Sequence, residues 1–260
     1  MSQNQPTSLF PIKTNRDILI FRLINDEVLV IGCDSAGGIG PKPLDKIRVD
    51  AFTLGKFTTR TALMEVLAVG ANPLCIVNTL SVEPKPTGNQ ILKGIRTEAK
   101  KVGVDPKLAV TGSMEKNIIV QQTGIGVTVI GRCRQEQLKI GTAQPDDIVV
   151  SIGIPCMGED VLSAERERKN AETQDILKLR DLTFIHELLP VGSFGIKREA
   201  QTLAEGSNLK AKIFPQDLID VEKSAGPGTV LLVALPKNEM KTLRQLTKKP
   251  ISIVAQLYAP

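Results

Sequence analysis

The sequence predicts a mixed α/β protein. Apolar runs with the length of strands alternate with segments of helical periodicity along the whole chain. Clusters of glycine and proline separate these segments, and 21 Gly and 16 Pro occur among the 260 residues. Hydrophobic residues make up 42% of the chain and charged residues 23%, which is typical of a soluble globular protein with a large core. This length suffices for one large domain or two of ordinary size.

The first half is expected to begin with a loose polar arm over residues 1–15, which contain Pro6 and Pro11. Two apolar runs joined across residues 25–27 then predict a β-hairpin. The expected strands lie at 18–24, 28–33, 74–80, 107–110 and 124–131, and the expected helices lie at 58–70 and 88–103. Gly70 provides the stop signal of the first of these helices.

The composition becomes loop-like at 141–147, and this stretch divides the chain into two predicted domains, 1–145 and 146–260. A strongly charged segment that ends at Lys169 predicts a solvated helical face. The expected strands lie at 148–154, 210–214, 230–235 and 251–257, with one helix at 197–205 and a basic helix between the last two strands. The lone histidine, His186, has no second histidine for a zinc site, so a structural role is expected for it.

The composition also restricts the function. Seven Phe, one Tyr and no Trp leave little aromatic surface for stacking bases, which argues against nucleic-acid binding. The net charge of +5 comes from basic residues interleaved with acids, and it suits an anionic small substrate or nucleotide. The four cysteines form no Cys-x-x-Cys pair, so a zinc site is not expected. No apolar stretch approaches the ~20 residues of a membrane span, and a cytoplasmic location without membrane contact is expected.

The stretch from Asp34 to Lys42, Asp-Ser-Ala-Gly-Gly-Ile-Gly-Pro-Lys, is the strongest candidate site. It follows an apolar run, so an acid and a glycine-rich loop are expected at the end of a buried strand. Gly37, Gly38 and Gly40 lack a Cβ, which lets the backbone approach a bulky anion and present its N–H groups. Lys42 adds positive charge, and Asp34 offers an oxygen ligand for a divalent cation. One interpretation is a phosphate-and-magnesium site, and the other is a plain glycine turn.

Neither common nucleotide motif fits this stretch. Gly32 and Gly37 have the spacing of a Walker loop, but Gly38 stands where the lysine is required. A dinucleotide fingerprint is also excluded, because the prolines that follow obstruct the expected start of a helix.

Two further acids are candidates. Glu65 lies on a predicted helix of mostly apolar residues, where it is either a solvated residue or a metal ligand that faces the glycine loop. Acid, lysine and small residues gather again in Thr111-Gly-Ser-Met-Glu-Lys-Asn117, just beyond an expected strand end. Glu115 can ligate a metal there and Lys116 can contact phosphate, although each is more often a simple loop charge.

Taken together, three motifs resemble the aminoimidazole ribonucleotide synthetase superfamily. They are Asp34-x-x-Gly-Gly-Ile-Gly-Pro-Lys42, Leu63-Met-Glu-Val-Leu-Ala-Val-Gly-Ala-Asn-Pro73 and Thr111-Gly-Ser-Met-Glu-Lys-Asn117. The later segments Leu188-Leu-Pro-Val-Gly-Ser-Phe-Gly-Ile196 and Ser224-Ala-Gly-Pro-Gly-Thr229 look like its second-domain counterparts. The resemblance implies a PurM-like fold, with the N-terminal sheets of two chains joined in a barrel-like dimer core and a C-terminal α/β sandwich.

The resemblance also implies a chemistry, in which ATP and magnesium phosphorylate or activate an oxygen. Carried over to this sequence, Asp34, Glu65 and Glu115 would hold one or two magnesium ions, and Asp34, Lys42 and Lys116 would act in catalysis. The residues expected to bind the nucleotide are Gly37, Gly38, Gly40, Lys42, Thr111, Gly112 and Ser113.

Two positions depart from the pattern of the superfamily. Glu65 stands where its members usually have Asp, which moves the carboxylate out by about one methylene and changes the geometry offered to magnesium. The Gly-Gly-Asp-Thr element is not intact around Glu115, so Asn117 is an alternative counterpart.

Among the subfamilies, the chain looks most like α-ribazole kinase, on its compact length and on its Thr-Gly-Ser-x-Glu and Leu-Pro-Val-Gly-Ser segments. Such an enzyme would transfer the γ-phosphate of ATP to the 5′-hydroxyl of α-ribazole in cobamide nucleotide-loop salvage. The alternatives are a thiamine-monophosphate kinase, an amidine-forming cyclo-ligase and a non-catalytic nucleotide-binding protein. The expected partners are ATP, a nucleoside-like small molecule and a second copy of the chain in a homodimer.

Overall fold

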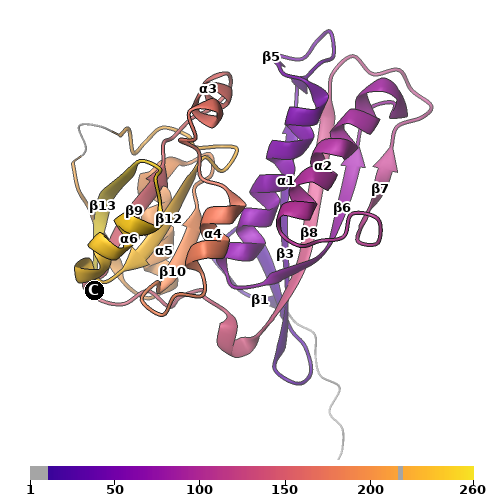
Figure 1. Cartoon of the computed structure of the whole chain (residues 1–260). Coiled ribbons are helices and arrows are strands. Elements are labelled where there is room, and N and C mark those ends of the chain that lie inside the picture. Colours follow the sequence, from indigo (N-terminus) through magenta and orange to yellow (C-terminus); the bar gives the residue numbers. More distant parts are fainter. Residues whose placement is uncertain (1–10, 216–218) are drawn as a thin grey trace, which may run out of the picture.

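The computed structural model describes residues 11–215 and 219–260. They form two large β-sheets with helices packed on them and one short two-stranded sheet, which confirms the predicted mixed α/β class (Figure 1). The first sheet is built from strands within residues 11–134 and the second from strands within residues 148–258. The predicted domain boundary after residue 145 falls between the two sheets, and the division into domains stays a prediction.

The first sheet has the strand order β1-β2-β3-β8-β6-β7. In that order its strands are β1 (Pro11–Ile12), β2 (Ile18–Arg22), β3 (Glu27–Gly37), β8 (Gly124–Arg134), β6 (Asn72–Leu80) and β7 (Val110–Met114). Neighbouring strands are antiparallel except β6 and β7. The described part of the chain leaves the sheet open at β1 and β7, so the barrel across two chains stays a prediction.

Several expected boundaries in this half were wrong. The hairpin of β2 and β3 is present, but β3 continues to Gly37 because β8 pairs with it along its whole length, as far as Gly124. The strand expected at 107–110 lies instead at 110–114, where it pairs with β6. The loose arm is wrong for residues 11 and 12, which pair with β2, and its first ten residues lie outside the described chain.

Helices α1 (Ala51–Ala68) and α2 (Asn89–Lys101) cover one face of the first sheet. Helix α1 starts seven residues before the expected position because Asp50 caps it, accepting hydrogen bonds from the Thr53 N–H at 2.9 Å and the Thr53 hydroxyl at 2.6 Å. The two helices approach closely at Gly55, where a Cβ would lie 2.2 Å from the Ile91 carbonyl oxygen. This contact requires glycine and sets the position of α2.

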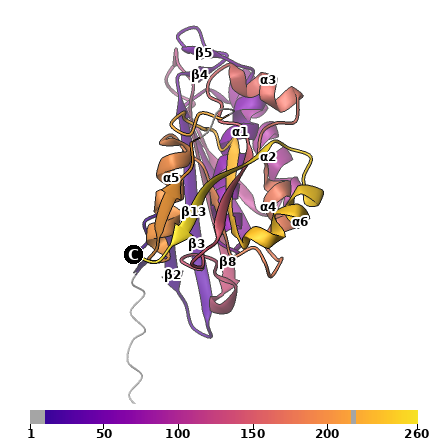
Figure 2. The same cartoon turned by 90° about the vertical axis from the view of Figure 1, so that its left-hand side faces the viewer.

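The second sheet is antiparallel throughout and has the order β10-β12-β9-β13-β11. Its strands are β10 (Glu187–Pro190), β12 (Val230–Leu235), β9 (Ile148–Gly153), β13 (Ile251–Tyr258) and β11 (Lys210–Ile213). Helix α5 (Gly195–Gly206) packs on one face, and α4 (Thr173–Leu179) and α6 (Met240–Leu246) lie on the other side (Figure 2). Helix α3 (Asp160–Arg166) lies in the charged segment, and a short parallel pair, β4 (Ile39–Gly40) with β5 (Ile47–Arg48), follows β3.

One buried apolar cluster joins the two sheets. It runs from Val28 and Val30 of β3, through Leu63 and Leu67 of α1, to Val150 of β9. The two sheets therefore share one hydrophobic core, and loops of the second sheet pack against α1. His186 has its Nδ1 atom 2.7 Å from the Oδ2 atom of the buried Asp147, which agrees with a structural role.

The four cysteines are free thiols. Within the described residues, none of the helices has the length and hydrophobicity needed to span a membrane.

Candidate functional site

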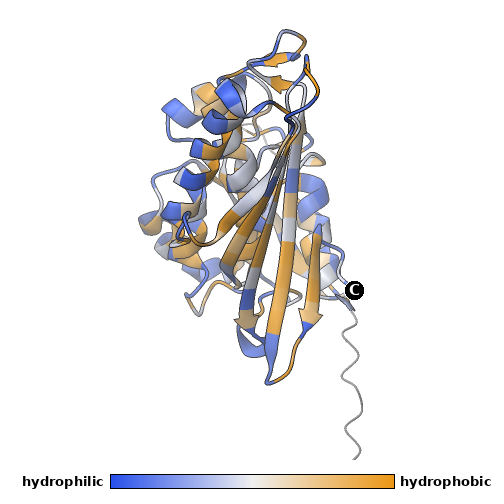
Figure 3. Cartoon of the chain, turned by 90° about the vertical axis from the view of Figure 1, so that its right-hand side faces the viewer, coloured by the Kyte–Doolittle hydropathy of each residue, from blue (hydrophilic) through white to orange (hydrophobic). Residues whose placement is uncertain are grey.

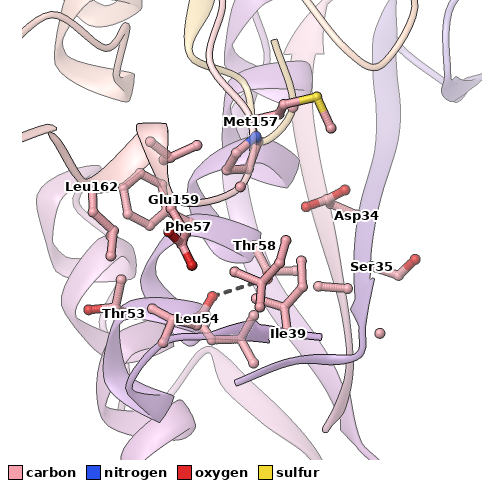
Figure 4. Close-up of a pocket in the computed structure, with 18 of the residues that line it drawn as sticks. Asp34, Ser35, Ile39, Thr53, Leu54, Phe57, Thr58, Met157, Glu159 and Leu162 are labelled. Carbon is pink, nitrogen blue, oxygen red and sulfur yellow. Dashed lines mark hydrogen bonds between the residues drawn. The ribbon is translucent and has the colours of Figure 1, made fainter. Parts of the chain in front are cut away.

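A cavity of about 370 Å³ lies where the end of β3, the start of α1 and loops of the second sheet meet. Figure 4 shows Asp34 on one side of it and Leu162 on the other. Its apolar walls include Ile39, Leu54, Phe57, Met157, Val161 and Leu162, and hydroxyl groups come from Ser35, Thr53, Thr58, Ser193 and Ser224. A mostly apolar cavity of this size, with a few convergent polar groups, suits a small organic ligand.

Asp34 lies in an environment that is unusual for a carboxylate. It lies on β3, opposite Val127 of β8, and lines the cavity. Burial raises its pKa from 3.8 to about 6, although hydrogen bonds from the Ser35 backbone and the Thr61 side chain oppose the rise. A carboxylate with this pKa gains and loses a proton close to neutral pH, as a general base must.

The charged groups of the cavity wall favour an uncharged or cationic ligand. Arg48 is the only basic residue among the described residues of the wall. Its guanidinium donates hydrogen bonds to the carbonyl oxygens of residues 41–43, at 2.6 to 3.1 Å, and so holds the turn of the glycine segment. The other charged wall residues are the acids Asp34 and Glu159. The wall therefore offers no uncommitted cation to a phosphate group.

The glycine segment is a turn held by its own hydrogen bonds. Gly38 has φ +68° and donates its N–H to the Thr123 carbonyl oxygen at 2.9 Å. The Asp45 carboxylate accepts from the Lys42 N–H, the Thr123 N–H and the Thr123 hydroxyl, each at 2.7 Å. At Gly40 a Cβ would lie 2.6 Å from that hydroxyl. Asp45 was not among the predicted site residues, because its only signal in the sequence is an acid in a turn-forming stretch.

Lys42, expected to contact phosphate, is paired within the chain. Its ammonium group contacts the Glu83 carboxylate. Burial alone would raise the pKa of Glu83, but hydrogen bonds from Lys42 and Thr87 outweigh it and lower this pKa to about 2. Lys42 therefore fastens the turn to the segment after β6.

Lys46 is a better-placed cation that the sequence analysis did not single out. Together with Gly37 and Gly38 it lines an open hollow of about 650 Å³, which also includes Gln122 and Thr123. Its side chain is exposed and takes no part in an ion pair within residues 11–215 and 219–260. Gly37 also lines the cavity beside Asp34, so the two hollows meet at the end of β3.

Glu65 lies among charges from the N-terminal segment and α5. Burial raises its pKa from 4.5 to about 8; Arg16 opposes this rise, and Glu199, Asp17 and Asp34 add to it. Glu65 is therefore protonated and neutral at pH 7 in this fold. Its acidic neighbours do not include Glu115.

Replacing Glu65 by glutamine is expected to alter the pH dependence of stability. The pKa of Glu65 is raised in the folded state. The contribution of Glu65 to the stability of the natural protein is therefore fully present below pH 4.5 and is lost as the pH rises through about 8. Above pH 8 the Glu65→Gln variant should be more stable by on the order of 2 kcal/mol. Urea unfolding at pH 5 and pH 9 measures this, with Glu205→Gln as the control at an exposed acid; equal curves for Glu65→Gln and the natural protein at pH 9 would contradict it.

The residues from Thr111 to Ser113 lie in β7, an exposed edge strand, rather than in a loop beyond a strand end. The parallel pairing with β6, such as Thr111 with Val77, extends the strand through them. Glu115 accepts hydrogen bonds from the Asn117 N–H at 2.7 Å and the Ile118 N–H at 3.2 Å. These bonds lower its pKa and tie its carboxylate to its own turn, and Lys116 beside it is exposed.

Of the predicted metal ligands, Asp34 on β3 and Glu65 on α1 are electrostatic neighbours, since Asp34 adds to the raised pKa of Glu65. Glu115 follows β7. In the described residues, no group of three or more His, Cys, Asp or Glu side chains is arranged to hold a metal. A magnesium site built from these carboxylates stays a prediction.

A buried charge network fastens α3 to α1 at the cavity. The Arg60 guanidinium donates to both carboxylate oxygens of Glu165, at 2.8 and 2.9 Å, and lies 3.6 Å from the Glu98 carboxylate. Lys56 donates to Glu165 at 2.7 Å. Both cations also lie over the ring of Phe57, 4.8 Å (Arg60) and 5.4 Å (Lys56) from its centroid. This network holds the Phe57 ring and the α3 residues that line the cavity.

Comparisons with known proteins show similarity to a protein family and to solved structures. Residues 15–133 match the family model of the AIR synthase related protein, N-terminal domain. This segment of the chain is similar to that domain. No curated protein sequence matches the chain.

Three solved structures resemble the whole described fold. PurL of T. maritima bound to ADP has a TM-score of 0.66 at 16% identity and covers 96% of this chain, which spans only 43% of PurL. Thiamine-monophosphate kinase of Stenotrophomonas maltophilia has a TM-score of 0.63 at 17% identity, covering 94% of this chain and 87% of its own. AaThiL bound to AMPPCP and TMP has a TM-score of 0.67 at 12% identity, covering 95% and 85%. These similarities confirm the predicted PurM-like fold.

Proposed function

We propose that the chain is an ATP-dependent small-molecule kinase, which transfers the γ-phosphate to a hydroxyl of an acceptor bound in the cavity beside Asp34. The observation that carries this proposal is the Asp34 carboxylate, whose pKa of about 6 suits a general base, in a cavity of small-molecule size. The expected acceptor is α-ribazole, at its 5′-hydroxyl.

The proposed phosphoryl transfer needs a group that accepts the hydroxyl proton and a γ-phosphate that is aligned with the acceptor oxygen. The acceptor oxygen attacks the γ-phosphorus while the bond from that phosphorus to the β-phosphate oxygen breaks, and ADP leaves. The hydroxyl proton passes to the Asp34 carboxylate. Phosphoryl transfer depends mainly on such positioning and on electrostatic stabilisation of the phosphate oxygens, rather than on covalent chemistry by the protein.

We propose that the nucleotide binds in the open hollow beside Lys46. Two similar structures support nucleotide use, because PurL was solved with ADP and AaThiL with the ATP analogue AMPPCP. The hollow meets the acceptor cavity at Gly37, where a γ-phosphate can reach a hydroxyl beside Asp34. Because Mg²⁺ is usually bound through one or two carboxylates together with substrate phosphates, we propose that it enters with the substrate as MgATP.

The acceptor is proposed to be a nucleoside without a phosphate group. AaThiL was solved with TMP, a phosphate ester. A buried phosphate requires cationic partners, and the only basic residue of the described cavity wall, Arg48, is committed to three carbonyl oxygens. The apolar walls and hydroxyl groups suit a ring system with an attached sugar, such as α-ribazole.

The decisive experiment measures ADP release by the purified chain with MgATP and each of α-ribazole, thiamine monophosphate and simple ribonucleosides. Stoichiometric ADP and a phosphorylated product with α-ribazole would support the kinase and its acceptor. Product with thiamine monophosphate instead would overturn the argument from the cavity wall. Confirmed ATP binding without turnover on any acceptor would favour the non-catalytic alternative.

A homodimer is proposed from the uncovered face of the first sheet. Figure 3 shows this face as long apolar strands with no described helix over them. Leu19, Ile31, Ile130 and Cys75 lie in one row across it, because β2, β3, β8 and β6 pair them in register. An apolar sheet face of this kind is normally covered by a partner.

Replacing Ile31 by aspartate is expected to convert the dimer to a monomer, because it puts a charge in the middle of the apolar row. Sedimentation velocity measures the change. Leu108→Asp is the control, since Leu108 is 87% exposed and lies outside the sheet. A natural chain that sediments as a monomer, or a dimer that both variants keep, would contradict the proposal.

A further inference from the structure

A basic groove on the outer side of α2 has no part in the proposed reaction. Figure 1 places α2 beyond α1 as seen from the second sheet. The groove, here called the α2 groove, has a volume of about 460 Å³. It is lined by Asn89, Lys93, Arg96, Thr97, Lys100, Asp105, Pro106 and Lys107.

The cations of the α2 groove form no ion pairs with the described part of the chain. Lys93, Arg96 and Lys100 follow at i, i+3 and i+7, so they lie on one face of α2, and Lys107 joins them from the next turn. All four are exposed, and none takes part in an ion pair within residues 11–215 and 219–260. The one acid of the groove, Asp105, accepts a hydrogen bond from the Lys107 N–H at 2.8 Å and so caps its own turn.

The packing of α2 against the protein keeps its basic face exposed to solvent. The opposite face is buried through Ile91, Ile95 and Ala99. A Cβ at Gly94 would lie 2.2 Å from the Phe52 carbonyl oxygen, so the helix is fixed tightly on α1. Its acid, Glu98, is turned inward toward Arg60 and Lys101. Like charges at this spacing repel one another, and Asp105 is the one acid that lines the groove within the described residues.

We propose that the α2 groove binds an acidic segment of a partner protein. The three cations of α2 span about 10 Å along the helix, which calls for an extended anion with several separate charges rather than one compact group. Leu108, beside Lys107, is 87% exposed and offers an apolar contact to a peptide. Asn89 and Thr97 provide side-chain polar groups for a peptide backbone. The groove has no aromatic side chain for stacking bases, so its chemistry favours a peptide over a nucleic acid.

The test measures binding of a fluorescein-labelled octaglutamate peptide to the full chain by fluorescence anisotropy. We expect saturable binding that weakens as salt is raised. The variant Lys93→Glu/Arg96→Glu should weaken it by about tenfold or more, because two attractions become repulsions. Both positions are exposed, so circular dichroism and the melting temperature should stay unchanged in the same samples.

The control variant is Lys241→Glu/Arg244→Glu, which has the same spacing on α6 and the same change in net charge. It lies outside the α2 groove and should leave the affinity within about twofold. An equal loss of affinity in both variants would show that the peptide is attracted by net charge alone, and it would overturn the proposed site. Tighter binding of tripolyphosphate or of oligo-dT than of the peptide, lost in the α2 variant, would overturn the acidic-segment assignment. None of these outcomes depends on kinase activity.

Discussion

Replacing Asp34 by asparagine is expected to reduce turnover with MgATP and the acceptor by about 10²- to 10⁴-fold, the usual effect of removing a general base. Asparagine keeps the size of the side chain but cannot take the hydroxyl proton. Because the base must be deprotonated, kcat/KM of the natural protein should rise with pH through a midpoint near 6. The variant should lose this rise, and a pH profile of kcat/KM for both proteins measures it.

The control for this prediction is Glu159→Gln, which changes another carboxylate of the same cavity wall. Its rate should stay within a few-fold of the natural protein, since exposed Glu159 is not assigned the proton transfer. Removing the buried charge of Asp34 is not expected to lower the melting temperature, so lost activity cannot be blamed on unfolding. An Asp34→Asn protein that turns over at the natural rate would rule out Asp34 as the base.

Replacing Arg60 by alanine is expected to destabilise the protein by about 3–5 kcal/mol, the cost of removing one partner of a buried ion pair. The Arg60 side chain is 1% exposed and Glu98 is fully buried, and the change leaves Lys101 as the ion-pair partner of Glu98 within the described residues. The same change removes both hydrogen bonds from Arg60 to Glu165, which leaves Lys56 to hold α3 at the cavity. Urea unfolding followed by circular dichroism measures the loss.

The matched control is Lys197→Ala. Lys197 pairs with Glu222 at 2.7 Å, but both side chains are exposed, so its removal should cost less than about 1 kcal/mol. Acid titration adds a second test. Burial alone would raise the pKa of Glu165, but hydrogen bonds from Arg60 and Lys56 outweigh it and hold this pKa below its ordinary value of 4.5. The natural protein should therefore lose stability as the pH falls below 4.5, and Arg60→Ala should lose less. Equal stability losses in the Arg60 and Lys197 variants would contradict the role of the network.

Local sequence determined much of the secondary structure. The helix expected at 88–103 lies at Asn89–Lys101, and the strands expected at 148–154 and 230–235 lie at Ile148–Gly153 and Val230–Leu235. In each case apolar periodicity is confined to the element itself, and residues nearby in sequence decide it. The turn at Gly38 and Gly40 was also one of the two interpretations of the glycine segment, because positive φ is available to glycine at no steric cost.

Pairing between distant residues decided the other elements. Thr111 reads as loop in isolation, and it becomes strand because Val77, far away along the chain, lies beside it in β6. For the same reason β3 ends at Gly37 rather than at the expected Cys33, because β8 pairs with it as far as Gly37. Strand pairing of this kind depends on which segments the fold brings together, and no local pattern contains that information.

The candidate site divides in the same way. The sequence by itself pointed to Asp34, to the glycine segment and to the PurM-like fold, because these depend on residue type, spacing and resemblance. Only the tertiary structure showed that Glu83 neutralises Lys42, that Lys46 lies beside Gly37 without an ion pair in the described residues, and that burial raises the pKa of Asp34 to about 6. Charge pairing and desolvation depend on which atoms surround a group in space, and those atoms come from β6, β8, α1 and the second sheet rather than from sequence neighbours.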